Sequence, residues 1–154
     1  MRLALAAALT LVLAAASASA AMPERRLTPD EIASLPKVGG GAGTSGVAGL
    51  QTTVLSGDPA KAGPYTIALS VPAHTKIAAH THRDDRASVV VSGEWFFGYG
   101  AVADDAKVKA LAPGGFYTEP AGEPHFAQTR DKPAVVYISG FGPTDTVYQA
   151  APKP

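Results

Sequence analysis

From Leu50 onward, short runs of alternating apolar and polar residues are separated by turns rich in glycine and proline. In one such run every second residue is apolar, namely Tyr65, Ile67, Leu69 and Val71. Side chains alternate between the two faces of a strand, so this pattern predicts half-buried strands. Sixteen glycines and thirteen prolines among 154 residues exceed average usage and indicate frequent turns.

About ten strands at near-even spacing are expected, with almost no helix. The segment ASVVV, the Ser92-Gly93 turn and EWFFGYG together predict an aromatic-rich hairpin. A chain of many short strands predicts an all-β sandwich or closed barrel, and a jelly roll fits the count best. The expected strand segments are LQTTVL, YTIALSV, KIAAHTH, ASVVV, EWFFGYG, VKALA, FYTEP, HFAQT, AVVYISG and TVYQA.

The region before the strands divides into two parts. Residues 1–20 combine Arg2, an apolar run and a small-residue ending at Ala20, which predicts a cleavable signal peptide. We therefore expect export to the periplasm or the medium, cleavage after Ala20 and no membrane attachment afterwards. Residues 21–49 are expected to form a tail, a short helix and a glycine-rich linker, and residues 50–150 to form the barrel.

The short helix is predicted from LTPDEIASLP. Thr28 fits the N-cap, Pro29 fits the first helical position, and Glu31 completes a capping box, with the helix ending before Pro36. The stretch from Gly41 to Gly46 formally matches a dinucleotide-binding fingerprint. That fingerprint must follow a strand and open a helix, and this stretch does neither, so we interpret it as a linker.

Composition and missing motifs exclude several classes of function. The formal net charge is zero, and the chain has no basic stripe, which argues against binding of nucleic acid. It contains no cysteine, so neither a disulfide framework nor a cysteine nucleophile is available. The GxSxG elbow of serine hydrolases and the Walker loop of nucleotide-binding proteins are also missing.

Metal-binding chemistry is concentrated in the histidines. The chain has four of them, and His80 and His82 are one residue apart on an expected strand. Residues at that spacing point to the same face, so the pair can chelate a metal ion. His74 lies outside this pattern and is expected at the surface.

Around these histidines the sequence resembles the cupin superfamily in two motifs. The first family motif is His-x-His, three or four residues, a glutamate, six residues and a glycine. The second is a glycine, five residues, Pro-x-Gly, two residues and a histidine. The matching residues are His80, His82 and Gly93 in the first motif, and Gly114, Pro120, Gly122 and His125 in the second.

The resemblance implies a jelly-roll barrel, or double-stranded β-helix, with one divalent metal inside. The implied ligands are His80, His82 and His125, commonly joined by a glutamate. Neutral imidazoles suit iron, manganese, nickel and zinc, among other transition metals. Cupin enzymes include dioxygenases, isomerases and lyases, so this chain is a candidate enzyme of one of those types. Cupins often pair through sheet edges, which makes a homodimer a further expectation.

One position departs from the first motif, because Arg86 stands where the family has glutamate. A guanidinium neither ligates a metal nor gives up its proton. At about 5 Å from a dication, its repulsion is about 6 kcal/mol at an effective dielectric near 20. Glu119 could compensate by pairing with Arg86 or by ligating the metal. Alternatively, Asp84 and Asp85, otherwise expected to be solvated, could draw Arg86 outward, or an anionic substrate could neutralise both cations.

Seven aromatic residues are expected mostly in the core, as a small β-domain requires. Some could line a ligand cavity, where Tyr117 or Tyr137 would offer a hydroxyl group. The seven are Tyr65, Trp95, Phe97, Tyr99, Phe116, Tyr117 and Tyr137.

Two functions follow from these patterns. The first is a metalloenzyme acting on a small anionic organic molecule, with Arg86 and Glu119 as candidate catalytic residues. The second is a metal-free or weakly metal-binding module that binds or senses such a molecule. An Arg86–Glu119 pair beside converging imidazoles would favour the first function, whereas an unpaired Arg86 would favour the second.

Overall fold

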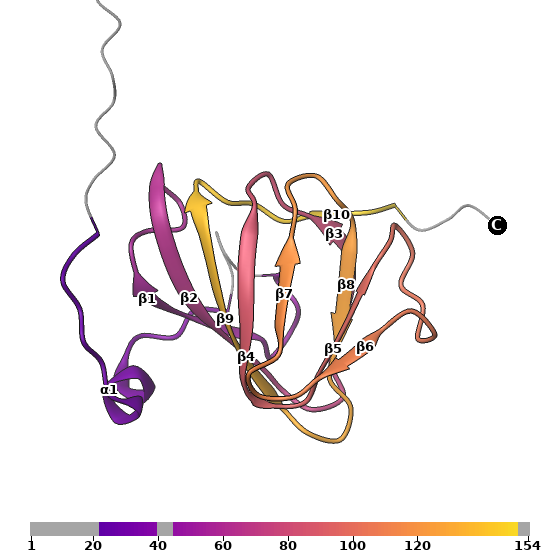
Figure 1. Ribbon diagram of the computed structural model, residues 1–154, viewed down its shortest axis with the longest axis horizontal. Helices are drawn as coiled ribbons and strands as arrows, with labels where there is room; N and C mark the ends of the chain where they lie inside the picture. The colour runs from indigo at the N-terminus through magenta and orange to yellow at the C-terminus, as the bar shows by residue number, and fades with distance from the viewer. Residues whose placement is uncertain (1–21, 40–44, 151–154) are drawn as a thin grey trace, which may run out of the picture.

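Ten strands form two antiparallel sheets that face each other across the core (Figure 1). The computed structural model describes residues 22–39 and 45–150. The first sheet has the strand order β1-β2-β9-β4-β7, and the second has the order β10-β3-β8-β5-β6. The strands are β1 (Gln51–Ser56), β2 (Gly63–Val71), β3 (Lys76–Thr81), β4 (Arg86–Gly93), β5 (Trp95–Tyr99), β6 (Lys109–Leu111), β7 (Phe116–Glu119), β8 (His125–Gln128), β9 (Ala134–Gly142) and β10 (Val147–Tyr148).

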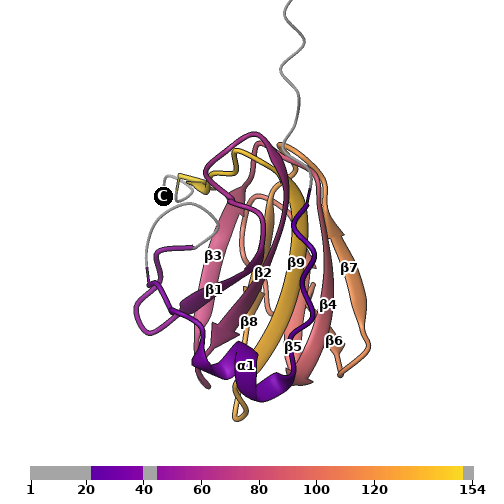
Figure 2. The same cartoon turned by 90° about the vertical axis from the view of Figure 1, so that its left-hand side faces the viewer.

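The core lies between the two sheets, which Figure 2 shows as two layers. The alternating residues of β2 face inward as predicted, with Tyr65, Ile67, Leu69 and Val71 all buried. They meet inward-facing residues of β9, its neighbour along its full length. Burial of these apolar faces provides the main stabilisation of the sandwich, and it confirms the all-β prediction.

The one described helix, α1 (Pro29–Ser34), lies outside the two sheets (Figure 1). Thr28 is its N-cap, and the backbone and side chains of Thr28 and Glu31 form the predicted reciprocal capping box. None of its residues is buried, so the caps rather than core packing hold this short helix. No helix within residues 22–39 and 45–150 is long and apolar enough to cross a membrane. The expected signal peptide and residues 40–44 of the glycine-rich stretch lie outside the described residues.

The predicted hairpin of β4 and β5 is wrong. Strand β4 pairs with β7 and β9 in the first sheet, whereas β5 pairs with β6 and β8 in the second. At the turn between them, Gly93 has a φ of 79°, and a Cβ there would collide with the Pro133 carbonyl. Four of the five residues of β5 are buried, so this strand needs neighbours on both edges rather than β4 alone. The chain therefore crosses from one sheet to the other at Gly93.

Candidate metal centre

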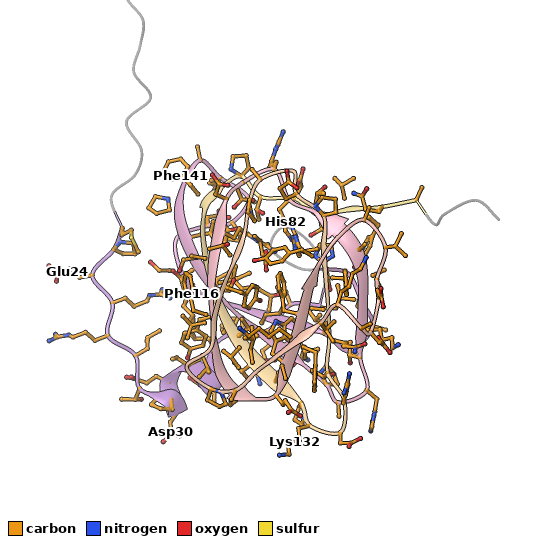
Figure 3. All side chains as sticks on the ribbon, turned by 45° about the vertical axis from the view of Figure 1, so that its right-hand side comes forward. Glu24, Asp30, His82, Phe116, Lys132 and Phe141 are labelled. Carbon is orange, nitrogen blue, oxygen red and sulfur yellow. The ribbon has the colours of Figure 1, made fainter. Side chains whose placement is uncertain are left out.

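The three motif histidines come together on the inner face of the second sheet. His80 lies on β3, His82 follows the last residue of β3, and His125 begins β8. His80 and His125 are direct cross-strand partners, which brings the two motifs to the same place. All three side chains are buried, and one ring nitrogen from each lies within 4.8 Å of the others. Figure 3 shows the labelled His82 inside the sandwich, whereas Phe116 lies on its outside.

Backbone carbonyls fix the orientation of all three imidazoles. Each Nδ1 lies at hydrogen-bond distance from a main-chain oxygen. A carbonyl oxygen can only accept, so each Nδ1 carries the hydrogen and each Nε2 carries a lone pair. The Nε2 of His125 has no hydrogen-bond partner within the described part of the chain. The acceptors are Ala78 O for His80 (2.7 Å), Asp145 O for His82 (2.5 Å) and Glu123 O for His125 (3.1 Å).

Burial also keeps these imidazoles neutral. It lowers the pKa of His80 to about 4 and the pKa of His82 to about 3, and the nearby Arg86 charge adds to the effect on His82. Burial likewise lowers the pKa of His125. At neutral pH all three rings are therefore uncharged, which is the form that binds a metal ion.

Arg86 and Glu119 face the imidazoles from the first sheet. They are cross-strand partners on β4 and β7, and both are buried. Arg86 Nε donates to Glu119 Oε2 at 2.5 Å, and Arg86 Nη2 contacts the same oxygen. That oxygen also lies 3.6 Å from Nε2 of both His82 and His125. Of the three compensations considered for Arg86, pairing with Glu119 is therefore present.

The Arg86–Glu119 pair holds both partners in their charged forms. Burial alone would favour a neutral Glu119, but the adjacent Arg86 charge opposes burial, and the pKa of Glu119 lies below its ordinary value. Burial similarly opposes the charge of Arg86, and Glu119 outweighs it and raises the pKa of Arg86. The guanidinium has a second contact, because Nη2 also donates to the lone pair of His82 Nε2.

The expectation of a solvated loop charge is wrong for Asp84 and correct for Asp85, which is exposed. Neither carboxylate draws Arg86 outward, because Arg86 is buried and paired with Glu119. Asp84 is buried, and its carboxylate accepts hydrogen bonds from Tyr65 (2.7 Å) and Thr144 (2.5 Å). Asp85 accepts from the backbone N–H of Ala121 at 2.8 Å. Tyr65 and Thr144 are far from Asp84 in the sequence, so no local pattern pointed to this network. His74 has a side chain that is 73% exposed, as expected.

The imidazoles and the ion pair line a small cavity. It has about 20 Å³ of room for the centre of a water-sized sphere, enough for a single ion or one to two small groups. Sequence reasoning did not place Ser45, Leu69, Ile77 or Ile138 there, although alternation along β2 had already placed Leu69 on an inward face. The lining residues are Ser45, Leu69, Ile77, His80, His82, Arg86, Trp95, Tyr117, Glu119, His125 and Ile138.

The donor set fits a metal ion. Three neutral imidazoles present Nε2 atoms to one space, and an ionised carboxylate oxygen lies beside two of them. The buried, unpartnered Nε2 of His125 is a lone pair for which the described residues offer no proton donor. The triad His80, His82 and His125 could therefore hold a divalent metal.

Comparison with known proteins finds similarity in structure. No protein-family model matches the chain, and no curated protein matches it in sequence. The polyketide cyclase RemF from Streptomyces resistomycificus is similar with a TM-score of 0.64 at 13% identity, over 85% of this chain and 89% of that one. An RmlC-like cupin from Shewanella frigidimarina gives a TM-score of 0.56 at 17% identity, over 78% and 92% of the two chains.

A third similar structure is the DMSP lyase DddQ from Ruegeria pomeroyi, with a TM-score of 0.50 at 20% identity over 60% of this chain. The chain spans about half the length of the DMSP lyase structures that it matches, 47% in each case. The cyclase and the lyase carry different activities in their names, and what all three neighbours share with this chain is the fold.

Proposed function

We propose, on the premise of the cupin fold that this chain adopts, that it binds one divalent transition metal and a small anionic organic molecule. The proposed metal ligands are His80, His82 and His125 together with Glu119, and the metal is iron, manganese, nickel or zinc. Arg86 holds the anionic group of the organic molecule. Export with removal of residues 1–20 is part of the same proposal, and N-terminal sequencing of periplasmic or secreted protein would then begin at Ala21.

The orientation of the three imidazoles is the observation that carries this proposal. Each ring donates its Nδ1 hydrogen to a main-chain carbonyl, so all three Nε2 lone pairs face one space, where Arg86 contacts only that of His82. Histidines that only fill a core have no need to turn three lone pairs toward one point. The Arg86–Glu119 pair adds support, because its charges cancel and the cavity no longer repels a dication.

The chain's own residues have distinct roles in this proposal. A bound metal would supply a Lewis acid with open coordination positions. Arg86 presents a planar fork of donors that suits a carboxylate, and the buried cavity excludes bulk water around it. An organic anion that binds Arg86 would replace Glu119 on the guanidinium. The Glu119 carboxylate would then be available to ligate the metal.

A second candidate function is a binding module that works without metal. The observation that favours it is the hydrogen bond from Arg86 to His82, which occupies a lone pair that a metal would need. In this case the cavity binds or senses a small anion through Arg86 and the neutral imidazoles. The two candidates differ in a measurable quantity, the metal content of the protein.

Elemental analysis of protein purified from its own host tests the proposal. We expect about one equivalent of transition metal per chain, and its loss in His80→Ala and His125→Ala. His74→Ala is the matched control, because His74 lies at the surface and should leave the metal content unchanged. No metal after reconstitution with iron, manganese, nickel and zinc would overturn the proposal and leave the binding module. Oxygen uptake and product formation from small organic acids then decide whether the loaded protein is an enzyme.

A further inference from the structure

Three buried polar groups near the cavity are not used by the proposed metal site. They are the Ser88 hydroxyl, the Trp95 indole N–H and the Tyr117 hydroxyl, on residues that are 1%, 2% and 6% exposed. None of the three completes a hydrogen bond of normal geometry in the ranges that the structure describes, although the Tyr117 hydroxyl lies close to both Ser88 and Trp95. A buried polar group without a partner costs about 1–3 kcal/mol, so three in one place need a physical reason.

The strand register places these groups next to the ion pair. Ser88 and Tyr117 are cross-strand partners on β4 and β7, two residues along each strand from Arg86 and Glu119. Because side chains alternate along a strand, both pairs face the interior and are neighbours on the same face of the sheet. Trp95 approaches the Tyr117 hydroxyl from β5 of the opposite sheet. Trp95 and Tyr117 line the same cavity as Arg86 and the imidazoles.

The chemistry of these groups specifies the partner that is missing. An indole N–H can only donate, and a phenol or hydroxyl can turn its hydrogen toward an acceptor. A ligand oxygen with two lone pairs, such as a carbonyl or carboxylate oxygen, can accept from two such donors. The Phe97 ring packs against both Tyr117 and His125, with centroid distances of 4.0 Å and 5.5 Å. The cavity itself has apolar walls that suit a short carbon chain, formed by Leu69, Ile77 and Ile138.

We propose that Trp95 and Tyr117, supported by Ser88, bind the carbonyl oxygen of a small oxo acid whose carboxylate is held by Arg86. This inference rests on the proposed function for the role of Arg86, and it narrows the ligand from any small anion to a carboxylate with a second acceptor oxygen. The cavity as it stands has room for one to two small groups, so even the smallest oxo acid requires the side chains around it to move. The ligand satisfies donors that the folded chain leaves unpaired, so the second oxygen adds affinity as well as orientation.

The single tryptophan of the chain allows a direct test. Its indole N–H gives one signal in a ¹H–¹⁵N correlation spectrum, and that signal moves when the N–H gains an acceptor. We expect saturable movement with pyruvate, and about tenfold weaker binding of propionate, which has the same carbon chain without the oxo oxygen. Equal affinities, or an indole signal that neither acid moves, would show that the donors serve only a bound water and would overturn the inference.

Variants assign the effect to Tyr117. Tyr117→Phe keeps the ring and removes only the hydroxyl, so we expect pyruvate binding to weaken about three- to tenfold while propionate binding stays the same. Ser88→Ala is a second variant for which a smaller loss is expected. Tyr137→Phe is the matched control, because Tyr137 alternates with the buried Val136 and Ile138 and so faces outward. Unchanged pyruvate affinity in Tyr117→Phe would contradict the proposed site.

Measurements on metal-free and metal-loaded protein separate this inference from the proposed function. Pyruvate that moves the indole signal in a protein unable to take up metal would support the oxo-acid site and overturn the metal proposal. A protein that binds metal but shows no indole response to pyruvate in either form would support the metal proposal and overturn the oxo-acid site. Metal content should be the same in Tyr117→Phe as in the unaltered chain, because Tyr117 is not a proposed ligand.

Discussion

Arg86 determines the charge balance of the cavity at the scale of single residues. It is buried beside three neutral imidazoles, where an unpaired guanidinium would repel a dication strongly. Glu119 cancels that charge from the adjacent strand, so a carboxylate is still present beside the histidines although it is not on the strand where the first cupin motif places it. The charges of Arg86 and Glu119 cancel, so the cavity does not repel a dication. Arg86 also adds a guanidinium that can hold an anion.

The variant Arg86→Glu tests this account. We expect its metal affinity to rise by at least about tenfold, because the substitution removes a cation, frees the His82 lone pair and adds a second carboxylate. The metal-free variant should be less stable than the unaltered chain, because two buried carboxylates then face each other. Isothermal titration calorimetry gives the affinity, and urea unfolding gives the stability.

The matched control for Arg86→Glu is Arg83→Glu, which makes the same charge change at a side chain that is 61% exposed. It should change metal affinity little, since exposed charges are screened. Unchanged or weaker metal binding by Arg86→Glu would contradict the role given to Arg86.

At the scale of secondary-structure elements, local patterns predicted where strands lie but not all of their partners. Alternation along Tyr65–Val71 predicted an inward face correctly, because burial of every second residue is a property of one strand. The hairpin prediction failed because strand pairing depends on β9 and β8, which are distant in sequence from β4 and β5. A glycine turn after a strand looks the same whether the chain reverses or crosses to another sheet.

The candidate site was likewise predicted from the sequence only in part. The motif spacing predicted the meeting of His80, His82 and His125, since the resemblance carries their three-dimensional relation. The partner of Arg86 stayed open among several carboxylates, because the Arg86–Glu119 register depends on how β4 meets β7. The unpartnered donors at Trp95 and Tyr117 have no sequence signature at all, because an unmade hydrogen bond depends on the positions of every neighbour.

Gly93 provides a prediction about the crossing between the sheets. Gly93→Ala adds a Cβ at a φ of 79° and drives it into the Pro133 carbonyl. Gly114→Ala is the matched control, because Gly114 has a φ of 85° with no atom within 4 Å of the added Cβ. Both variants should lose about 1–2 kcal/mol from backbone strain, and Gly93→Ala should lose at least about 2 kcal/mol more from the collision. Equal free energies of unfolding in urea would show that the turn tolerates a side chain.

At the scale of the whole molecule, the cavity joins the two sheets. The imidazoles come from the second sheet, and Arg86 and Glu119 come from the first. A ligand that contacts both walls binds only the folded sandwich, so it stabilises folding by linkage.

Metal binding should therefore raise the thermal stability of the chain. At a free metal concentration of 100 times Kd the gain is about 2.7 kcal/mol, which corresponds to a rise in Tm of roughly 5–15 °C. Calorimetry before and after addition of a chelator measures it. In His125→Ala the added metal should leave the Tm unchanged, and an equal rise in that variant would indicate metal binding elsewhere on the chain.

The three carbonyls that orient the imidazoles belong to the main chain, at Ala78, Glu123 and Asp145. A carboxylate or amide in that position could be lost through one codon change, but a peptide oxygen is retained whatever residue is encoded there. The orientation of the three rings is therefore insensitive to substitution at these three positions, and it changes only when the backbone itself moves. Relatives of this chain could then differ widely in the surrounding residues while keeping the same ring geometry, with selection acting on the histidines and on the path of the strands.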